Sequence, residues 1–194
     1  MSSMSSQTIP NAREAILEAA RQTAQTRGYG GLNFRDLAET VGIKSASIHY
    51  HFPTKADLGA AVAERYWQDT AGVLASMLEE TPEPLRCLAR YPEIFRRSLE
   101  NDNRLCLCSF MSAEYQDLPA PVRAEVQMFG DVNVAWLSEV LVAAKVAAPK
   151  AAGSRARAIF AAVAGAQLVA RSRCDLQLFD TLIDGYRSVG LLPG

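Results

Sequence analysis

Residues 37–58, LAETVGIKSASIHYHFPTKADL, contain two short helix-patterned segments joined by a tight turn. The first segment, 34–40, follows Asn33, which is a favourable N-cap residue, and it ends before Gly42. The second segment covers 46–51. Two short amphipathic helices joined by a glycine-containing turn form a helix-turn-helix motif. The spacing alone is equally compatible with a DNA-binding motif and with a helical hairpin that has an ordinary polar face.

Helical periodicity continues on both sides of this motif. Upstream, apolar residues recur every three or four positions from Asn11 until Gly28 ends the helix. Downstream, a long helix is expected from Thr54 to about Leu78, and the two prolines in 81–84 end it. Further helices are expected over 84–100, 104–115, 120–146, 152–173 and 175–188. No stretch alternates apolar and polar residues as a strand would, so the sequence predicts an all-α protein of about nine helices.

We expect these helices to form a small head and a larger body. The predicted helix-turn-helix domain covers 1–55, with about the first nine residues disordered. The predicted helical body covers 56–194.

The composition excludes several classes of protein. Of the 194 residues, 49% are hydrophobic and 21% are charged, which excludes a disordered tail. Charged residues interrupt every long apolar stretch, so we expect no membrane-spanning segment. The first residues, MSSMSSQTIP, lack the pattern of a signal peptide, which predicts a cytoplasmic protein whose four cysteines are reduced thiols.

The charge is distributed unevenly along the chain. The net charge of −1 excludes a uniformly basic nucleic-acid binder. Residues 1–55, however, contain six basic and four acidic side chains, a balance of +2, which leaves −3 for the remainder. A basic head on an acidic body permits contact with phosphates at one end of the molecule.

The helix-turn-helix stretch resembles the signature of the TetR family of transcriptional regulators. The resemblance covers about residues 10–60 and includes the turn, the Tyr-His-Phe sequence at 50–52 and the lysine at position 55. It implies a nine-helix subunit, an Ω-shaped homodimer, a palindromic double-stranded DNA operator and negative control of transcription. Two departures are His49, where an aromatic residue such as tyrosine is frequent, and 44–46, where many members have small residues and a glycine.

The resemblance and the polar face of the motif together nominate DNA-contacting residues. We expect residues 44, 45 and 47, which lead the recognition helix, to reach base edges, and the lysine at position 55 to bind a backbone phosphate. His49 and His51 point to different helix faces, so we expect no metal site and no cofactor. The candidate DNA-binding residues are Arg35, Lys44, Ser45, Ser47, His49, Tyr50 and Lys55.

A regulator of this kind also needs a site for an effector molecule. The body contains aromatic and sulfur-bearing side chains that could line such a site. Individually these side chains are also compatible with an ordinary core, but together they would suit a small apolar, amphipathic or electrophilic effector. The fourth helix would carry the signal, because it has aromatic residues near its middle and Lys55 at its start. The candidate effector-binding residues are Tyr66, Trp67, Cys106, Phe110, Met111, Tyr115, Phe129 and Trp136.

Cys106 is a candidate reactive thiol. The segment 104–118 resembles a TetR subgroup that includes a regulator responsive to N-ethylmaleimide and other electrophiles, whose sensing cysteine aligns with Cys106. A position in the first turn of a helix beside Arg104 favours the thiolate, whereas Asp102 opposes it. The alternative is a buried, unreactive thiol.

The last two helices are expected to form the dimer interface. Each contains an apolar stripe, and small residues on the first would let two helices approach closely. The candidate interface residues are Ile159, Val163, Ala166, Gln167, Ala170, Phe179, Leu182, Ile183 and Tyr186.

The sequence therefore predicts a ligand-responsive, DNA-binding repressor that is not an enzyme. One alternative is a cysteine-dependent enzyme that uses Cys106 with His49 or His51, although those histidines lie in the head and the cysteine in the body. Another is a helical adaptor that does not bind DNA, against which the polar recognition-helix residues argue.

Overall fold

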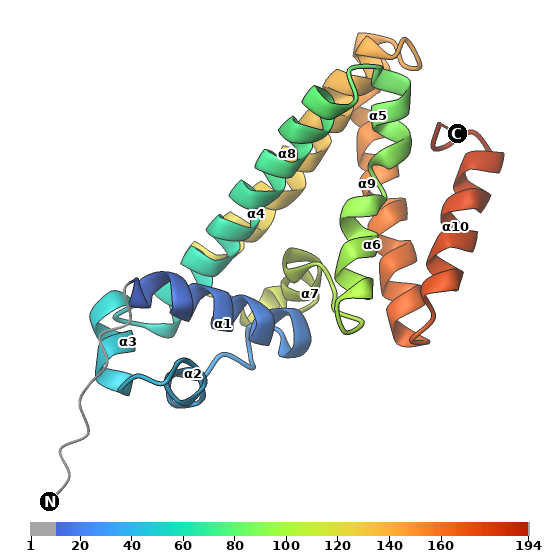
Figure 1. Ribbon diagram of the computed structural model, residues 1–194. Helices are drawn as coiled ribbons and strands as arrows, with labels where there is room; N and C mark the ends of the chain where they lie inside the picture. Colours follow the sequence, from blue (N-terminus) through green and yellow to red (C-terminus); the bar gives the residue numbers. More distant parts are fainter. Residues whose placement is uncertain (1–10, 194) are drawn as a thin grey trace, which may run out of the picture.

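The computed structural model describes residues 11–193, and within this range the chain is helical with no strand (Figure 1). The all-α fold predicted from the sequence is confirmed, whereas the disorder predicted for the first nine residues lies outside the described range. The elements are α1 (Ala12–Arg27), α2 (Phe34–Val41), α3 (Ser45–His51), α4 (Lys55–Glu80), α5 (Pro84–Arg90), α6 (Glu93–Glu100), α7 (Leu107–Ala113), η1 (Tyr115–Asp117), α8 (Ala120–Ala143), α9 (Pro149–Ser172) and α10 (Leu176–Ser188).

Helices α1 to α3 form the head, and their ends are fixed by local hydrogen bonds. The Asn33 side chain accepts from two backbone N–H groups of the first turn of α2. Gly42 ends α2 with φ 75°, a left-handed conformation that glycine adopts without steric cost. Thr54 and Asp57 form a reciprocal capping box at the start of α4. Fully buried side chains, Ile48 among them, hold α3 against the other head helices.

The segment 84–100 forms two helices rather than the single helix expected. Helix α5 ends at Arg90, and α6 begins at Glu93 after Pro92. Proline has no backbone N–H to donate to the carbonyl four residues earlier, and its ring clashes with that carbonyl, which explains the break. Ten α-helices are therefore present within residues 11–193.

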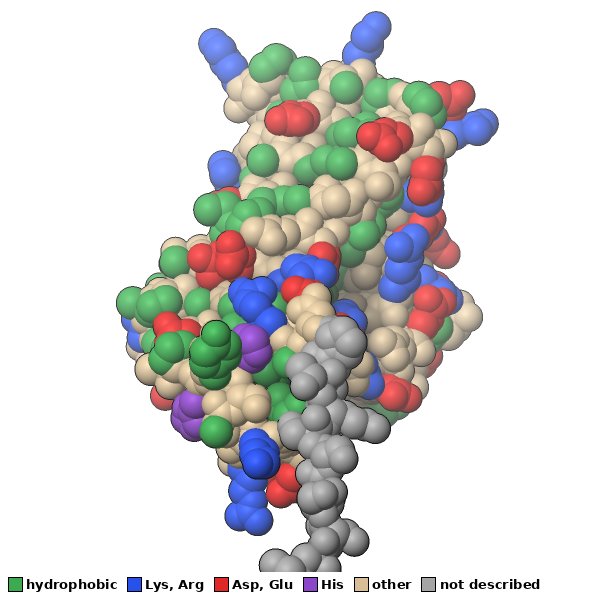
Figure 2. Space-filling view, turned by 60° about the vertical axis from the view of Figure 1, so that its left-hand side comes forward, with side chains coloured by type: hydrophobic (Ala, Val, Ile, Leu, Met, Phe, Trp, Pro, Cys, Tyr) green, Lys and Arg blue, Asp and Glu red, His purple; other side chains and the backbone are tan. Residues whose placement is uncertain are grey.

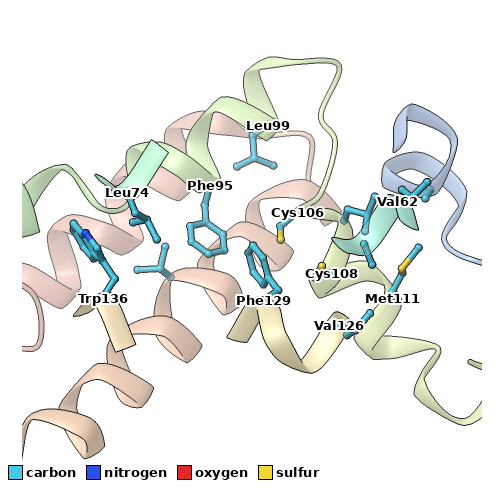
Figure 3. Packing of buried hydrophobic residues seen from close by; sticks show 14 of the residues in the cluster. Val62, Leu74, Phe95, Leu99, Cys106, Cys108, Met111, Val126, Phe129 and Trp136 are labelled. Atoms are coloured by element: carbon cyan, nitrogen blue, oxygen red, sulfur yellow. The ribbon is translucent and has the colours of Figure 1, made fainter. Parts of the chain in front are cut away.

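The body is built on long helices, of which α4 and α8 run parallel to each other while α9 runs antiparallel to α8. Figure 1 shows α8 directly behind α4, with α9 behind α5 and α6 and α10 at the outer edge. The buried side chains between these helices form a continuous apolar core, with Trp136 at one end and Met111 at the other (Figure 3). None of the helices in residues 11–193 combines the length and the apolar character needed to cross a membrane.

The predicted dimer stripe on α9 is wrong, because it lies inside the single chain. The stripe residues Ile159, Val163, Ala166, Gln167 and Ala170 are 0% exposed. The Gln167 side chain accepts a hydrogen bond from the Cys106 N–H at 3.1 Å and donates one to the Phe95 carbonyl at 2.7 Å. On α10, Phe179 and Ile183 are also buried, whereas Leu182 and Tyr186 are half-buried.

The position of this stripe generates a prediction about stability. Ala166→Glu should place an unpaired charge in the core of one subunit and lower the free energy of unfolding by about 3–5 kcal/mol. Urea unfolding at fixed protein concentration measures the change. Ala75→Glu, at an exposed position on α4, is the matched control and should change stability by less than about 0.5 kcal/mol. A folded Ala166→Glu monomer of undiminished stability would restore the stripe as an interface.

Candidate functional site

The first candidate site is the outward face of α3. Tyr50 is 84% exposed, and Lys44 and His49 are also exposed, while Ser45 and Ser47 are half-buried. The Lys44 side chain forms no cap hydrogen bond with α3. Figure 2 shows both histidines and several Lys and Arg side chains at the lower end of the molecule, on the head. The structure therefore brings hydrogen-bonding and basic groups together on one short helix, as base and phosphate contacts require.

Arg35 and His49 on the head differ in how firmly neighbouring side chains hold them. The Arg35 guanidinium lies 3.4 Å from the Glu39 carboxylate, and both side chains are exposed. Such an exposed ion pair contributes little to stability, so the guanidinium can exchange this partner for a phosphate at small cost. His49 is held more firmly, because its ring packs edge-on against Phe34 with centroids 4.7 Å apart.

Lys55 does not extend freely into solvent as a phosphate contact would. Its ammonium donates to the Gly30 carbonyl at 3.1 Å and lies 4.7 Å from the centre of the Tyr29 ring. These contacts hold the turn between α1 and α2 against the start of α4. The structure thus gives Lys55 a role within the head that the sequence pattern did not indicate.

The second candidate site is a cavity of about 440 Å³ between α7, α8 and α9. No charged side chain lines it, and its polar groups are hydroxyls, one thiol and one amide. An uncharged pocket of this size suits a small, largely apolar molecule with a few hydrogen-bonding groups. The lining residues are Leu105, Cys108, Ser109, Ser112, Tyr115, Val126, Gln127, Phe129, Gly130, Phe160, Ala164, Gly165 and Leu168.

Of the eight residues predicted to bind an effector, Tyr115 and Phe129 line this cavity. The other six do not line it, because their side chains contact other residues of the same chain, and the sequence alone did not identify those contacts. Three of them pack against aromatic or cationic groups: Tyr66 on Phe129, Trp136 on Tyr91, and Phe110 under the Arg171 guanidinium. The Trp67 indole donates a hydrogen bond to the Glu125 carboxylate at 2.7 Å. Met111 and Cys106 are buried in the core.

The cavity is instead defined by small residues, which sequence reasoning missed. Gly130 on α8 and Ala164 and Gly165 on α9 leave space where larger side chains would fill it. Their helical spacing from Gln127 and Leu168, which also line the cavity, was the available signal. That signal becomes readable only when the pairing of α8 with α9 is known.

The two neighbouring cysteines lie in the packed interior between Phe129 and Met111 (Figure 3). Cys106 is 2% exposed and Cys108 is 1% exposed. Burial raises the pKa of the Cys106 thiol, although hydrogen bonds from Ser109 oppose the shift. Burial also raises the pKa of Cys108 well above its usual range. These environments favour the neutral thiol, and Cys108, rather than the predicted Cys106, faces the cavity.

Comparison with known proteins identifies the kind of molecule that has this architecture. Residues 16–62 match the family described as "Bacterial regulatory proteins, tetR family". The chain is 26% identical over 141 residues to the HTH-type transcriptional repressor NemR of Escherichia coli, and this match covers 71% of each chain. The protein is a homologue of the TetR-family repressors.

Solved structures extend the TetR-family likeness to the whole chain. A TetR transcriptional regulator from Legionella pneumophila is 28% identical and covers 94% of this chain and 98% of its own, with a TM-score of 0.87. The reduced form of E. coli NemR covers the same shares at 21% identity, with a TM-score of 0.80. The TetR-family fold, with an N-terminal helix-turn-helix and a helical body, is thus established.

The alternative of a cysteine-dependent enzyme has no support in this geometry. His49 and His51 belong to α3, Cys106 precedes α7, and no hydrogen bond connects them within the described residues. The relatives are transcriptional regulators, which are not enzymes.

Thiol burial generates a prediction about reactivity. During brief exposure to N-ethylmaleimide at pH 7, the exposed Cys174 should be labelled first, and the buried Cys87, Cys106 and Cys108 far more slowly. Because burial raises the pKa of Cys106, its thiolate fraction at pH 7 falls about tenfold for every unit of increase, and its labelling should accelerate as the pH rises.

Mass spectrometry of peptides measures the four rates separately. Denatured protein is the control, since all four thiols should then react. Labelling of Cys106 as rapid as that of Cys174 would contradict the buried state and support a reactive thiol.

Proposed function

We propose that this protein is a ligand-responsive transcriptional repressor that binds a palindromic operator as a homodimer. The observation that carries the proposal is the exposed polar and basic face of α3 on a head homologous to TetR-family DNA-binding domains. Two recognition helices related by a two-fold axis would enter successive major grooves of the operator. Such a regulator acts in the cytoplasm, where its operator is accessible.

The proposed functions of the two domains are those predicted from the sequence. Residues 1–55 bind DNA, and residues 56–194 bind the effector and form the dimer. The effector is a small uncharged, predominantly apolar molecule that enters the cavity between α7, α8 and α9, since the lining offers hydroxyl and amide groups but no charge. Reversible binding is favoured over attack by a thiol, because the cysteines near the cavity are buried and have raised pKa values.

The DNA-binding proposal is tested with variants at the start of the recognition helix. Lys44→Ala or Ser47→Ala should weaken the binding free energy by about 1–3 kcal/mol for each base-edge hydrogen bond that the substitution removes, and should alter the preferred sequence. Lys150→Ala is the control for Lys44→Ala, because Lys150 is exposed in the first turn of α9 and away from the head.

Selection from random DNA with the purified protein supplies the operator, and fluorescence anisotropy at several salt concentrations supplies the affinities. Failure of the wild-type protein to enrich any motif would refute the repressor proposal.

The outward face of α9 is our revised dimer surface. It lies opposite the buried stripe and presents small and apolar residues, of which Leu168 is 57% exposed and Val169 is 45% exposed. Close approach of two copies would be possible along this face because several of its residues lack large side chains. The proposed α9 contacts are Ala158, Ala161, Ala162, Gly165, Leu168 and Val169, and the half-buried Leu182 and Tyr186 of α10 flank them.

Charge at this surface should separate the subunits without unfolding them. Ala161→Glu would place two like charges at the interface and weaken the dimer by several kcal/mol, on the order of other buried unpaired charges. Sedimentation velocity should show a folded monomer, while Ala75→Glu on α4 remains a dimer. A dimer of unchanged stability in Ala161→Glu would place the interface elsewhere.

A further inference from the structure

One contact between the head and the body lies outside the recognition helix and the cavity. The Glu114 carboxylate, directly after α7, accepts a hydrogen bond from the Tyr29 N–H at 2.6 Å and another from the Gly30 N–H at 3.2 Å. Tyr29 and Gly30 belong to the turn after α1, and Tyr29 precedes Glu114 by 85 residues. Successive amides that converge on one carboxylate form a compact anion-binding turn, and the charge strengthens both bonds.

The glycines of the turn leave room for the Glu114 carboxylate. Gly28 has φ 70°, and a Cβ atom at this position would overlap the Glu114 side chain. The Gly30 peptide is held from both sides, because its N–H donates to Glu114 and its carbonyl accepts from the Lys55 ammonium. The turn is thereby fixed between the body and the first residue of α4.

A hydrogen bond also connects the N-terminal end of α7 to the head. The Leu105 carbonyl, just before α7, accepts a hydrogen bond at 3.1 Å from the Gln25 amide in the last turns of α1. Figure 1 shows α7 directly beside α1, on the side of the head that faces the body. Both ends of one short helix therefore hold the C-terminal end of α1 and the turn that follows it.

The same segment forms one wall of the cavity. Residues between 105 and 115 line it together with α8 and α9, whereas no residue of α4 does so. A molecule in the cavity would contact α7 directly and would reach α4 only through other side chains. The fourth helix, which the sequence suggested as the connection between the two sites, is thus the less direct route.

We propose that Glu114 is the positioning residue through which α7 sets the orientation of the DNA-binding head. The inference rests on the proposed repressor function. It identifies the contact through which effector binding in the cavity would change DNA binding by the head. Helix α4 joins head and body as one continuous rod, and the bonds of Glu114 provide a second attachment that fixes the angle. Hydrogen bonds act only over short distances, so displacement of α7 by an occupied cavity must move the turn at residues 28–30 or break these bonds.

The attachment itself is tested by hydrogen exchange on the full-length protein without DNA. Glu114→Ala should accelerate amide exchange in the peptide that covers residues 28–31, and Glu114→Gln should give a smaller acceleration because it retains one acceptor oxygen. Glu125→Ala is the matched control, since it removes a carboxylate that joins α8 to Trp67 of α4 instead. Unchanged exchange at residues 28–31 in a folded Glu114→Ala protein would overturn the proposal.

The coupling is tested with a substitution that occupies the cavity without any ligand. Gly130→Leu adds a side chain to the cavity wall, and the operator is the sequence selected by the wild-type protein. In the wild-type and Glu125→Ala backgrounds, Gly130→Leu should weaken operator binding by about 5- to 150-fold, the usual range of allosteric coupling. In the Glu114→Ala background the same change should have an effect of less than about twofold, as expected for independent sites.

The outcomes separate the inference from the function on which it rests. Equal weakening by Gly130→Leu in all three backgrounds would refute the role of Glu114 and leave the repressor proposal standing. Loss of the effect in Glu125→Ala but not in Glu114→Ala would assign the connection to α4. No effect in the wild-type background would overturn both the connection and the cavity as the effector site, and a wild-type protein that binds no DNA would refute the proposed function.

Discussion

Helix α8 lies between α4 and α9 and buries an apolar face against each of them. Burial of apolar surface is the main stabilising contribution in a fold of this kind, and here it depends on a single helix being apolar on two sides. The arrangement fixes where α4 begins and therefore where the head lies. It also creates the cavity, because Gly130 on α8 and Ala164 and Gly165 on α9 leave space that larger side chains would fill.

Buried polar groups attach the shorter helices to this framework. The Tyr91 hydroxyl donates to the Asn133 side chain at 2.8 Å, which connects the α5–α6 junction to α8. The Gln167 side chain bonds the backbone on both sides of the interior, at Phe95 and Cys106, and so positions the start of α7. A buried amide without either partner would be left unsatisfied, so these bonds define one arrangement of α6 and α7 relative to α9.

Among the described residues no charged side chain is buried, and two charged side chains meet at a joint between the head and the body. The cavity wall contains no ionisable carboxylate or amine, whereas Glu114 and Lys55 meet at the turn that follows α1. Charged groups hold a joint over a short distance and in a defined direction, while apolar packing tolerates small shifts of whole helices. In the mechanism that we propose, an apolar ligand site and a polar head–body joint are therefore complementary parts of one device for moving the head.

The sequence by itself determined the local structure, including the helix-turn-helix, its caps at Asn33 and Gly42, the all-helical body and the family resemblance. These features depend on residues close together in the chain, where periodicity and capping preferences act directly. Tertiary structure alone decided which side of α9 is core, which aromatic residues reach the cavity, and that Lys55 and Glu114 meet the same turn. An apolar stripe fits a partner subunit as well as it fits the chain's own core, and a side chain's partner across dozens of residues is set by helix packing, which no local pattern encodes.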